Sequence, residues 1–391
     1  MESRTWWWIG GGAVVLAIIL FFVFSDGDSD GDTTTVPVAA DTTTTTEAEG
    51  TTTTEAGATT TTAAPLIGEG RLVGMAFDVG GRGDKSFNDL AALAFDDGMA
   101  MYGYDGDELT PNEGGENREE NLRLLAENGS ELIIANGFAF AQNVWRVGTE
   151  FPDTMIAITD DCPVDDTFAP VEMDNVRCML FAEEQGSYLM GVAAALKTTT
   201  GTVGFIGGVQ TGLIEKFQAG FEAGVAATDA DVTILPAVYL TQVPDFTGFT
   251  DPAKGKEAAL ALYEQGADVI FHAAGESGLG LFDAAVELNA DSDVKLWAIG
   301  VDADQWESVG GDAQEFIMTS MLKRVDVHVG KSILDFLEGN FAPGAVRLDI
   351  ESGGIGYATS GGHVDDIVTE LDAAAAGIVD GSIVVPTEPA A

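Results

Sequence analysis

The chain has few positive charges. Its 391 residues include 17 Lys and Arg against 64 Asp and Glu, which gives a formal net charge of -47. A surface of this sign repels both the phosphate backbone of nucleic acids and anionic lipids. We therefore expect no nucleic-acid partner and no strongly anionic ligand, whereas a neutral or cationic ligand is compatible with the charge.

Cysteine is also scarce. Only Cys162 and Cys178 are present, which is too few for a structural zinc site built on four thiolates. The sequence leaves two states open for this pair: a disulfide in an oxidising compartment, or two buried free thiols. A disulfide would close a loop of about 15 residues and contribute about 3 kcal/mol in the chain-entropy model.

The common catalytic motifs are missing. The chain has no HExxH zinc motif and no GxSxG nucleophile elbow, and Gly204–Gly208 matches neither a dinucleotide fingerprint nor a P-loop. His272 follows an apolar run and is interpreted as a core or cleft-lining residue. We therefore predict a protein that is not an enzyme and needs no metal or other cofactor.

The N-terminal region has an uninterrupted apolar run over residues 6–24. At about 1.5 Å per residue, this run nearly spans a hydrocarbon core of about 30 Å. Arg4 precedes the run and acidic residues follow it, which favours residues 1–5 in the cytoplasm and the rest outside. We predict a single-pass anchor in the cell membrane, with a cleaved signal peptide as the alternative. No cysteine follows the run, so lipid attachment there is excluded.

Residues 25–68 are dominated by Thr, Ala, Glu and Gly, including the threonine runs 42–46 and 59–62. This composition lacks an amphipathic period and cannot bury a core. We predict a disordered linker that tethers an extracytoplasmic domain to the membrane.

From Gly70 onward, short apolar runs alternate with amphipathic segments. Such alternation is typical of βαβ units and parallel sheets with helices on both faces. The strands are too many for one sheet, so we predict an α/β fold with two doubly wound lobes. The predicted strands cover residues 71–79, 131–136, 154–159, 175–181, 202–207, 232–240, 268–275, 295–302 and 316–322. The predicted helices cover residues 86–102, 117–128, 183–197, 213–227 and 252–265.

Polar residues and glycine follow several predicted strands. They are Asp78, Asn136, Asp160, Gly275 and Asp302. In doubly wound folds, ligands bind beyond the carboxyl ends of the strands. The sequence therefore predicts a polar cleft at this edge.

The segment DVGGRGDKSFNDLA (78–91) resembles the opening motif of the basic membrane protein family of ABC-transporter solute receptors, which includes purine nucleoside receptors. The resemblance extends from Arg71 to Pro386. Further matching stretches are Phe181–Leu196, Thr202–Gly208, Glu215–Gly224, Phe271–Gly280, Ile299–Gln305 and Thr319–Asp326. In the stretch 181–196, Gly186 and Gly191 are interpreted as sites of close packing.

The resemblance implies a fold similar to type I periplasmic binding proteins, with two lobes and a hinge. It implies an N-terminal lobe of residues 69–181 and 302–344 and a C-terminal lobe of residues 182–301 and 345–388. The implied function is capture of a purine nucleoside for ABC permease subunits by a monomer. A ligand sensor with a membrane partner is the alternative.

The resemblance also implies that Phe87 and Phe217 stack on the two faces of a base. Without the resemblance, Phe87 on its apolar helix face is better explained by core packing, and one of Phe217 and Phe221, which share a helical face, belongs to the core. Stacking contributes about 1–3 kcal/mol per base and needs no charge.

The polar site residues follow from the resemblance as well. Asp78 would accept hydrogen bonds from the ligand, Asp302 would accept from ribose hydroxyls, and Gly275 would allow close backbone contact. Lys323 would approach the ligand and neutralise carboxylates. Asp78 as a helix cap and Lys323 as a purely neutralising group remain alternatives.

Secondary ligand contacts are expected from Ser86, Asn88, Asn136 and Asp160. A second alternative is a metal-dependent nucleoside hydrolase, because the spacing of Asp78 and Asp84 loosely resembles the start of its calcium site.

Overall fold

The computed structural model describes residues 65–390. Within this range, no helix is long and apolar enough to cross a membrane. The predicted anchor at residues 6–24, and the predicted linker up to residue 64, lie outside the described residues. Residues 65–68 correct the end of that linker: the Gly68 amide donates to the Tyr102 carbonyl at 2.8 Å. The side chain of Leu66 lies close to Gly103, where a Cβ atom would collide with it.

The first sheet has six strands in the order β12-β5-β4-β3-β1-β2, and all of its pairings are parallel. Its strands are β1 (Leu72–Ala76), β2 (Asp105–Leu109), β3 (Leu132–Ala135), β4 (Met155–Thr159), β5 (Val176–Phe181) and β12 (Gly344–Leu348). Alternate residues of β1 face opposite cores. Val73 and Met75 pack under α1 (Phe87–Tyr102) and α9 (Val325–Leu337), and Ala76 packs with α2 (Arg118–Glu127) and α3 (Ala141–Glu150). The sheet is therefore covered on both faces.

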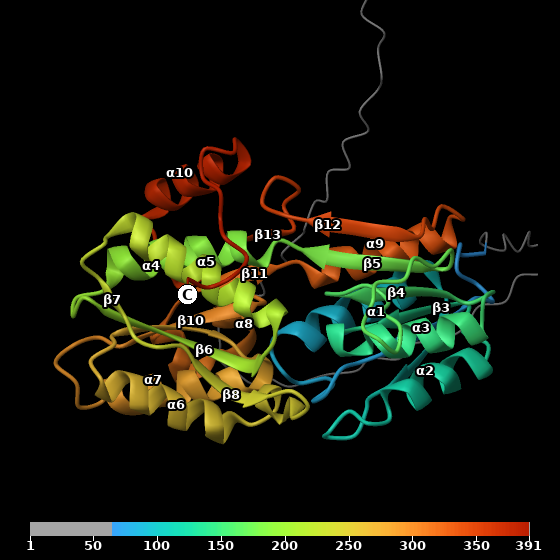
Figure 1. Ribbon diagram of the computed structural model, residues 1–391, viewed down its shortest axis with the longest axis horizontal. Helices are drawn as coiled ribbons and strands as arrows, with labels where there is room; N and C mark the ends of the chain where they lie inside the picture. Colours follow the sequence, from blue (N-terminus) through green and yellow to red (C-terminus); the bar gives the residue numbers. More distant parts are fainter. Residues whose placement is uncertain (1–64, 391) are drawn as a thin grey trace, which may run out of the picture. The chain divides into compact units, whose positions relative to one another are not determined.

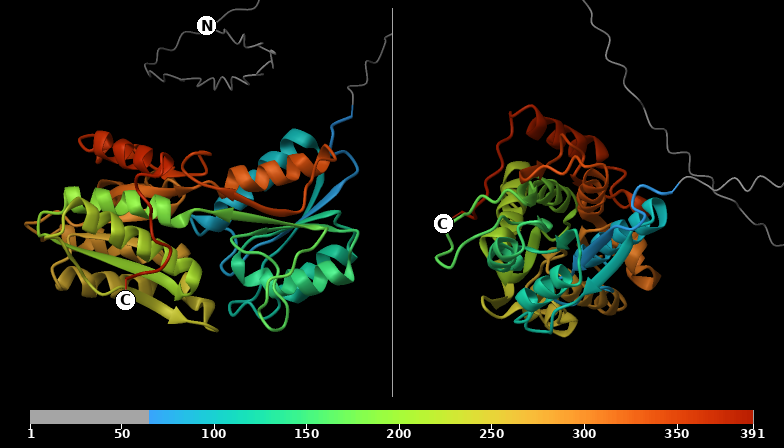
Figure 2. Two further views of the ribbon diagram at one scale, coloured as in Figure 1. Left: turned by 45° about the horizontal axis from the view of Figure 1, so that its top comes forward. Right: turned by 90° about the vertical axis from the view of Figure 1, so that its right-hand side faces the viewer.

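The second sheet has seven strands in the order β13-β11-β10-β9-β6-β7, and β8 also pairs with β6. Only β13 is antiparallel to its neighbour. Its strands are β6 (Thr202–Gln210), β7 (Thr233–Ile234), β8 (Val238–Gln242), β9 (Val269–Ala273), β10 (Trp297–Asp302), β11 (Ile317–Lys323) and β13 (Ile355–Tyr357). Figure 1 and Figure 2 show the two sheets in separate lobes of the described domain.

The helices are divided between the two lobes. Those of the first lobe are α1 (Phe87–Tyr102), α2 (Arg118–Glu127), η1 (Phe138–Phe140), α3 (Ala141–Glu150) and α9 (Val325–Leu337). Those of the second lobe are α4 (Glu183–Lys197), α5 (Gly212–Thr228), η2 (Phe246–Phe249), α6 (Pro252–Glu264), η3 (Gly275–Gly278), α7 (Leu279–Asn289), α8 (Gln305–Val309), η4 (Gly311–Glu315), η5 (Ser360–Gly362) and α10 (Val368–Val379).

Sheet membership corrects two of the predicted lobe boundaries. Residues 302–344 were assigned to the first lobe, but β11 pairs with β10, so the chain leaves the second sheet only after Lys323. Residues from 345 onward were assigned to the second lobe, but β12 pairs with β5 as far as Leu348. A buried apolar strand carries no sequence signal for the sheet that it joins, so periodicity could not assign β11.

The predicted α/β fold with parallel sheets is confirmed, with local differences. Strand β2 was not predicted because its sequence DGDEL is polar and half exposed. The predicted strand over residues 232–240 is divided into β7 and β8 around Pro236, which has no N–H to donate to a ladder.

Helices α4 and α5 pack in close contact through glycine. A Cβ atom on Gly220 would collide with the carbonyl of Glu184, and one on Gly191 would collide with the carbonyl of Phe221. A Cβ atom on Gly186 would press on Met321 and Ile355. Gly191 and Gly220 therefore let α4 and α5 lie directly against each other, and Gly186 lets α4 lie against β11 and β13. This is the close packing that the sequence predicted for Gly186 and Gly191.

We predict that Gly220→Ala lowers the free energy of unfolding by about 1–3 kcal/mol, because the methyl group forces the two backbones apart. Urea denaturation measures the effect. Gly212→Ala at the start of α5 is the matched control, since nothing lies within 4 Å of its Cβ position. Equal stability of the two variants would contradict the close packing.

Candidate functional site

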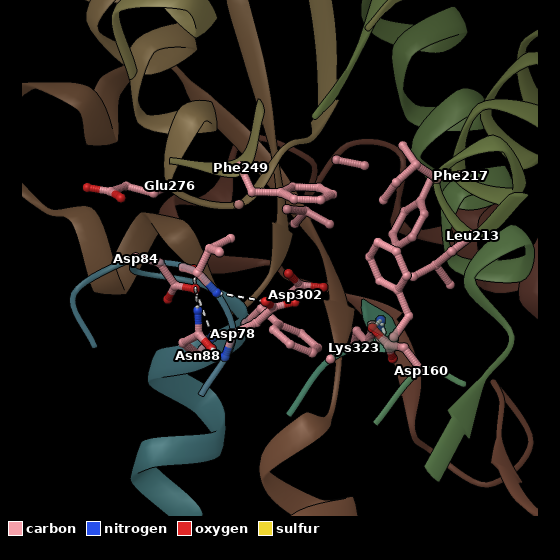
Figure 3. A pocket seen from close by; sticks show the side chains of 18 residues that line it. Asp78, Asp84, Asn88, Asp160, Leu213, Phe217, Phe249, Glu276, Asp302 and Lys323 are labelled. Carbon is pink, nitrogen blue, oxygen red and sulfur yellow. Dashed lines mark hydrogen bonds and ion pairs between the residues drawn. The ribbon is translucent and has the colours of Figure 1, made fainter. Parts of the chain in front are cut away.

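One pocket lies where the carboxyl ends of the strands of both sheets meet. Its non-atom space is about 630 Å³, open mouth included. Figure 3 shows Phe217 and Leu213 on one side, Asp78, Asp84 and Asn88 on the other, and Asp302 and Phe249 between them.

A buried lysine surrounded by carboxylates forms the floor of the pocket. Lys323 ends β11 and is 2 % exposed; its Nζ lies 2.7 Å from Asp160 Oδ2 and 3.5 Å from Glu183 Oε1. Asp302 lines the same pocket. Since Asp160 belongs to the first lobe and Glu183 to the second, Lys323 bridges the lobes beside the point where the chain crosses.

The charges of this cluster are strongly coupled. Burial raises the pKa of Asp160 and of Asp302 above the usual aspartate range, and Lys323 opposes both shifts. Burial also disfavours the charge of Lys323, but the carboxylates outweigh it and raise the pKa of the lysine. Lys323 therefore serves three buried carboxylates, of which only Glu183 has a further cation within residues 65–390, Lys216 at 3.4 Å. This excess of carboxylates leaves acceptor capacity for hydroxyl donors.

Two of these carboxylates stand on strained backbone. Asp160 has φ 74° and Asp302 has φ 63°, both in the left-handed region, which costs about 1–2 kcal/mol for a residue with a Cβ atom. Each follows a strand end, and each lines the pocket. Strain of this kind accumulates at functional sites. Ser86 donates to Asp302 Oδ2 at 2.8 Å and fixes that carboxylate.

Aromatic rings form the apolar walls. Phe87 of the first lobe and Phe217 of the second line the pocket, with ring centroids 5.3 Å and 5.7 Å from Lys323 Nζ. Phe138 and Phe249 line it too, in an edge-to-face pair with centroids 6.3 Å apart. Phe138 directly follows the predicted strand end at Asn136 and Gly137. Phe249 was missed, because it lies in a short 3-10 turn without a periodic signal.

Asp78 lines the pocket, and one of its two carboxylate oxygens already has protein donors. Arg118 donates to its Oδ1 from Nε at 2.8 Å and from Nη2 at 2.5 Å, and the Val79 amide donates to the same oxygen at 2.8 Å. The other oxygen, Oδ2, faces Gly137, where a side chain would collide with it. Arg118 was missed because it lies 40 residues away, at the start of an ordinary polar helix.

Asp84, rather than Asp78, satisfies the start of helix α1. Its carboxylate accepts the amides of Ser86 at 2.9 Å, Asn88 at 2.7 Å and Asp89 at 3.1 Å. Burial raises the pKa of Asp84 to about 6. The helix-cap alternative for Asp78 is therefore wrong. In the metal-dependent hydrolase alternative, Asp78 and Asp84 would hold the metal, but both carboxylates already accept hydrogen bonds from protein groups.

The predicted secondary contacts divide into two groups. Asn88 and Asp160 line the pocket, as does Gly275, which has φ 54°. Ser86 and Asn136 are fully buried and do not line the pocket, and their ligand contact stays a prediction. Asn136 donates to Asn88 Oδ1 at 3.2 Å, so its amide supports a pocket residue.

Cys162 and Cys178 form a disulfide with a Cα–Cα distance of 5.1 Å, which resolves the two states left open for them. The bond ties the loop after Asp160 to strand β5. His272 is fully buried, its Nε2 lies 3.0 Å from Gln305 Oε1, and burial lowers its pKa to about 4. It does not line the pocket, in agreement with its interpretation as a core residue. In the 65–390 range, no group of three or more His, Cys, Asp or Glu residues is arranged to hold a metal ion.

Comparison with known proteins gives a consistent family. Residues 72–388 match the family model Bmp, described as ABC transporter substrate-binding protein PnrA-like. The chain is 32% identical over 334 residues to a CD4+ T-cell-stimulating antigen of Listeria innocua, covering 81% of this chain and 88% of that protein. It is 31% identical over 279 residues to the ABC transporter nucleoside-binding protein BmpA of Lactococcus lactis, covering 68% and 74%.

A solved structure of an ABC transporter solute-binding protein from Aeropyrum pernix superposes on the chain with a TM-score of 0.69. The two sequences are 28% identical, and the match covers 81% of this chain and 94% of the other. The similarity extends over both lobes.

We predict that Lys323→Met lowers the free energy of unfolding by about 3–5 kcal/mol at pH 7, because the buried Asp160 loses its ion-pair partner and the nearby Asp302 and Glu183 lose a shared cation. A carboxyl whose pKa is raised by folding binds its proton more readily in the folded state. Stability therefore falls as the pH rises from the unfolded-state pKa through the folded-state pKa. The loss should accordingly be smaller at pH 5 than at pH 7.

Urea denaturation at the two pH values measures this difference. Lys331→Met is the matched control, since Lys331 is 67% exposed and pairs only with Asp335 across one helical turn. A loss for Lys323→Met that matches the control, or that grows toward pH 5, would contradict the described charge cluster.

Proposed function

The chain belongs to the Bmp family of ABC transporter substrate-binding proteins, and on this basis we propose that its ligand is a purine nucleoside held between the two lobes. Family membership implies a small-molecule ligand and ABC permease subunits as partners. The nucleoside-binding name belongs to the Lactococcus relative, and its transfer to this chain is part of the proposal.

One observation carries the proposal: aromatic rings from opposite lobes line the same pocket as a buried carboxylate cluster. Phe87 and Phe217 both lie within 6 Å of Lys323 Nζ, next to Asp160 and Asp302. A ligand with a flat ring system and attached hydroxyl groups fits this pocket, because the ring system can stack on the aromatic rings and the hydroxyl groups can donate to the carboxylates. The base gains stacking of about 1–3 kcal/mol, and the hydroxyls donate to carboxylates.

The charge of the pocket favours a ligand without phosphate. Asp78, Asp84, Asp160, Asp302 and Glu276 line the pocket, whereas Lys323 is the only cation in its lining. A phosphate would meet this excess in a poorly screened site, which supports a nucleoside over a nucleotide.

Individual roles follow from position. Asp302 is proposed to accept from ribose hydroxyls, because Ser86 already orients its Oδ2. Asp78 is proposed to offer Oδ2, because Arg118 occupies Oδ1. Gly275 would let the ligand approach the backbone, and Phe249 would extend the aromatic wall. The predicted anchor at residues 6–24 would hold this domain outside the cell next to the permease.

Calorimetric titration with adenosine, uridine, adenine and ribose tests the proposal. We expect submicromolar binding of adenosine, because stacking and charge-assisted hydrogen bonds together contribute several kcal/mol. Silence with every nucleoside, alongside binding of a sugar or a peptide, would overturn the nucleoside assignment. Release of free ribose during overnight incubation would instead favour the hydrolase alternative.

We predict that Asp302→Ala weakens adenosine binding about 10- to 100-fold, as expected for a lost charge-assisted hydrogen bond. Binding of free adenine should change much less, since adenine has no ribose hydroxyls. Asp312→Ala, on the exposed turn η4 of the same lobe, is the control. Equal weakening of nucleoside and base would contradict the role given to Asp302.

A further inference from the structure

Arg118 is a buried arginine that lies outside the pocket and touches both of its lobes. It stands at the first position of α2 in the first lobe and is 4% exposed. It donates twice to Asp78, and its Nη1 lies 3.3 Å from the Gly115 carbonyl. A buried ion pair is costly unless it is well supported, so this position requires an explanation beyond simple stability.

The second partner of Arg118 comes from the other lobe. Its guanidinium carbon lies 4.7 Å from the ring centroid of Phe246, the first residue of η2. Phe246 also lies 6.1 Å from Phe138 of the first lobe, centroid to centroid. At its other end, η2 carries Phe249, which lines the pocket. Arg118 therefore lies between a pocket carboxylate of one lobe and an aromatic turn of the other.

The position of this contact makes it sensitive to lobe movement. The chain crosses between the lobes after β5, β11 and β12. In Figure 1, α2 and β8, which precedes η2, lie on the side opposite to β5 and β12. A rotation about the crossings moves the opposite rim farthest, so opening separates Arg118 from Phe246. The bond to Asp78 lies within one lobe and persists.

We propose that Arg118 is a positioning residue that couples Asp78 to lobe closure through Phe246. In the open state it holds Asp78 Oδ1 and leaves Oδ2, which lies beside Gly137 of the pocket lining, for the ligand. On closure the Phe246 ring covers the already paired guanidinium, and the cation–π contact stabilises the closed form. As far as it concerns the ligand, this inference rests on the proposed nucleoside function.

The test compares Phe246→Leu, Arg118→Met and the double variant in the full chain. Phe246→Leu leaves the ion pair intact and should weaken adenosine binding about 3- to 30-fold, the range expected for a partly desolvated cation–π contact. Arg118→Met should weaken binding further, because Asp78 also loses its partner, and Arg118→Lys should restore part of the loss. The double variant should weaken binding by less than the product of the two single effects.

The two controls are the same kinds of substitution, Arg→Met and Phe→Leu, at residues that do not take part in the Arg118–Phe246 contact. Arg123→Met lies on the same helix, where Arg123 pairs with part-buried Glu119 and exposed Glu150. Phe316→Leu removes a ring that contacts a cation, Lys295, within the second lobe. Both controls should leave adenosine affinity unchanged, and a thermal melt of every variant shows which ones fold.

A second readout does not depend on any ligand. Spin labels on Glu127→Cys of α2 and Glu257→Cys of α6 report the distance between the lobes in the unliganded chain, since both native cysteines are in the disulfide. Phe246→Leu should shift the distance distribution toward longer values. If wild type binds no nucleoside but this shift occurs, the ligand assignment fails and the coupling stands. An unchanged distribution, unchanged affinity, or a strictly multiplicative double variant would overturn the coupling.

Discussion

The architecture of the site depends on the ion pairs of Lys323. The lysine is buried where the second sheet ends and the chain crosses to the first lobe, so its carboxylate partners come from both sides of the crossing. Its rigid placement by strand β11 fixes the position of Asp160, and the excess of acid over base leaves carboxylate oxygens available in a dry environment. The aromatic rings of Phe87 and Phe217 then line the pocket beside that charge. Without the lysine, the same carboxylates would repel one another and keep the lobes apart.

The fold was largely predictable because buried parallel strands and amphipathic helices leave a strong periodic signal. The sequence located the strand ends at Asp78, Asp160 and Asp302, and the structure brings all three to one pocket. Lobe membership was less predictable: β11 and β12 follow the usual apolar or mixed patterns of strands, and only tertiary pairing decides which sheet each one joins. Sheet pairing depends on packing against distant neighbours, which a local pattern does not encode.

The site was predicted incompletely for a related reason. Residues within a strand-end motif could be found from the sequence, but their partners could not. Arg118 reaches Asp78 across 40 residues, and Phe249 enters the pocket from a short turn. Conversely, Ser86 and Asn136 belong to the motif region yet are fully buried and do not line the pocket. The sequence therefore identifies the strand ends from which the site is built, whereas the orientation of each polar side chain is decided by long-range hydrogen bonds.

The central claim is that a nucleoside lies between the two lobes, with its base on aromatic rings and its sugar on the carboxylates. A crystal structure of the protein with bound adenosine tests this most directly. We expect the base to lie between Phe87 and Phe217 and a ribose hydroxyl to lie within hydrogen-bond distance of Asp302. Adenosine bound outside this pocket, or with its ribose directed away from Asp302 and Asp160, would contradict it.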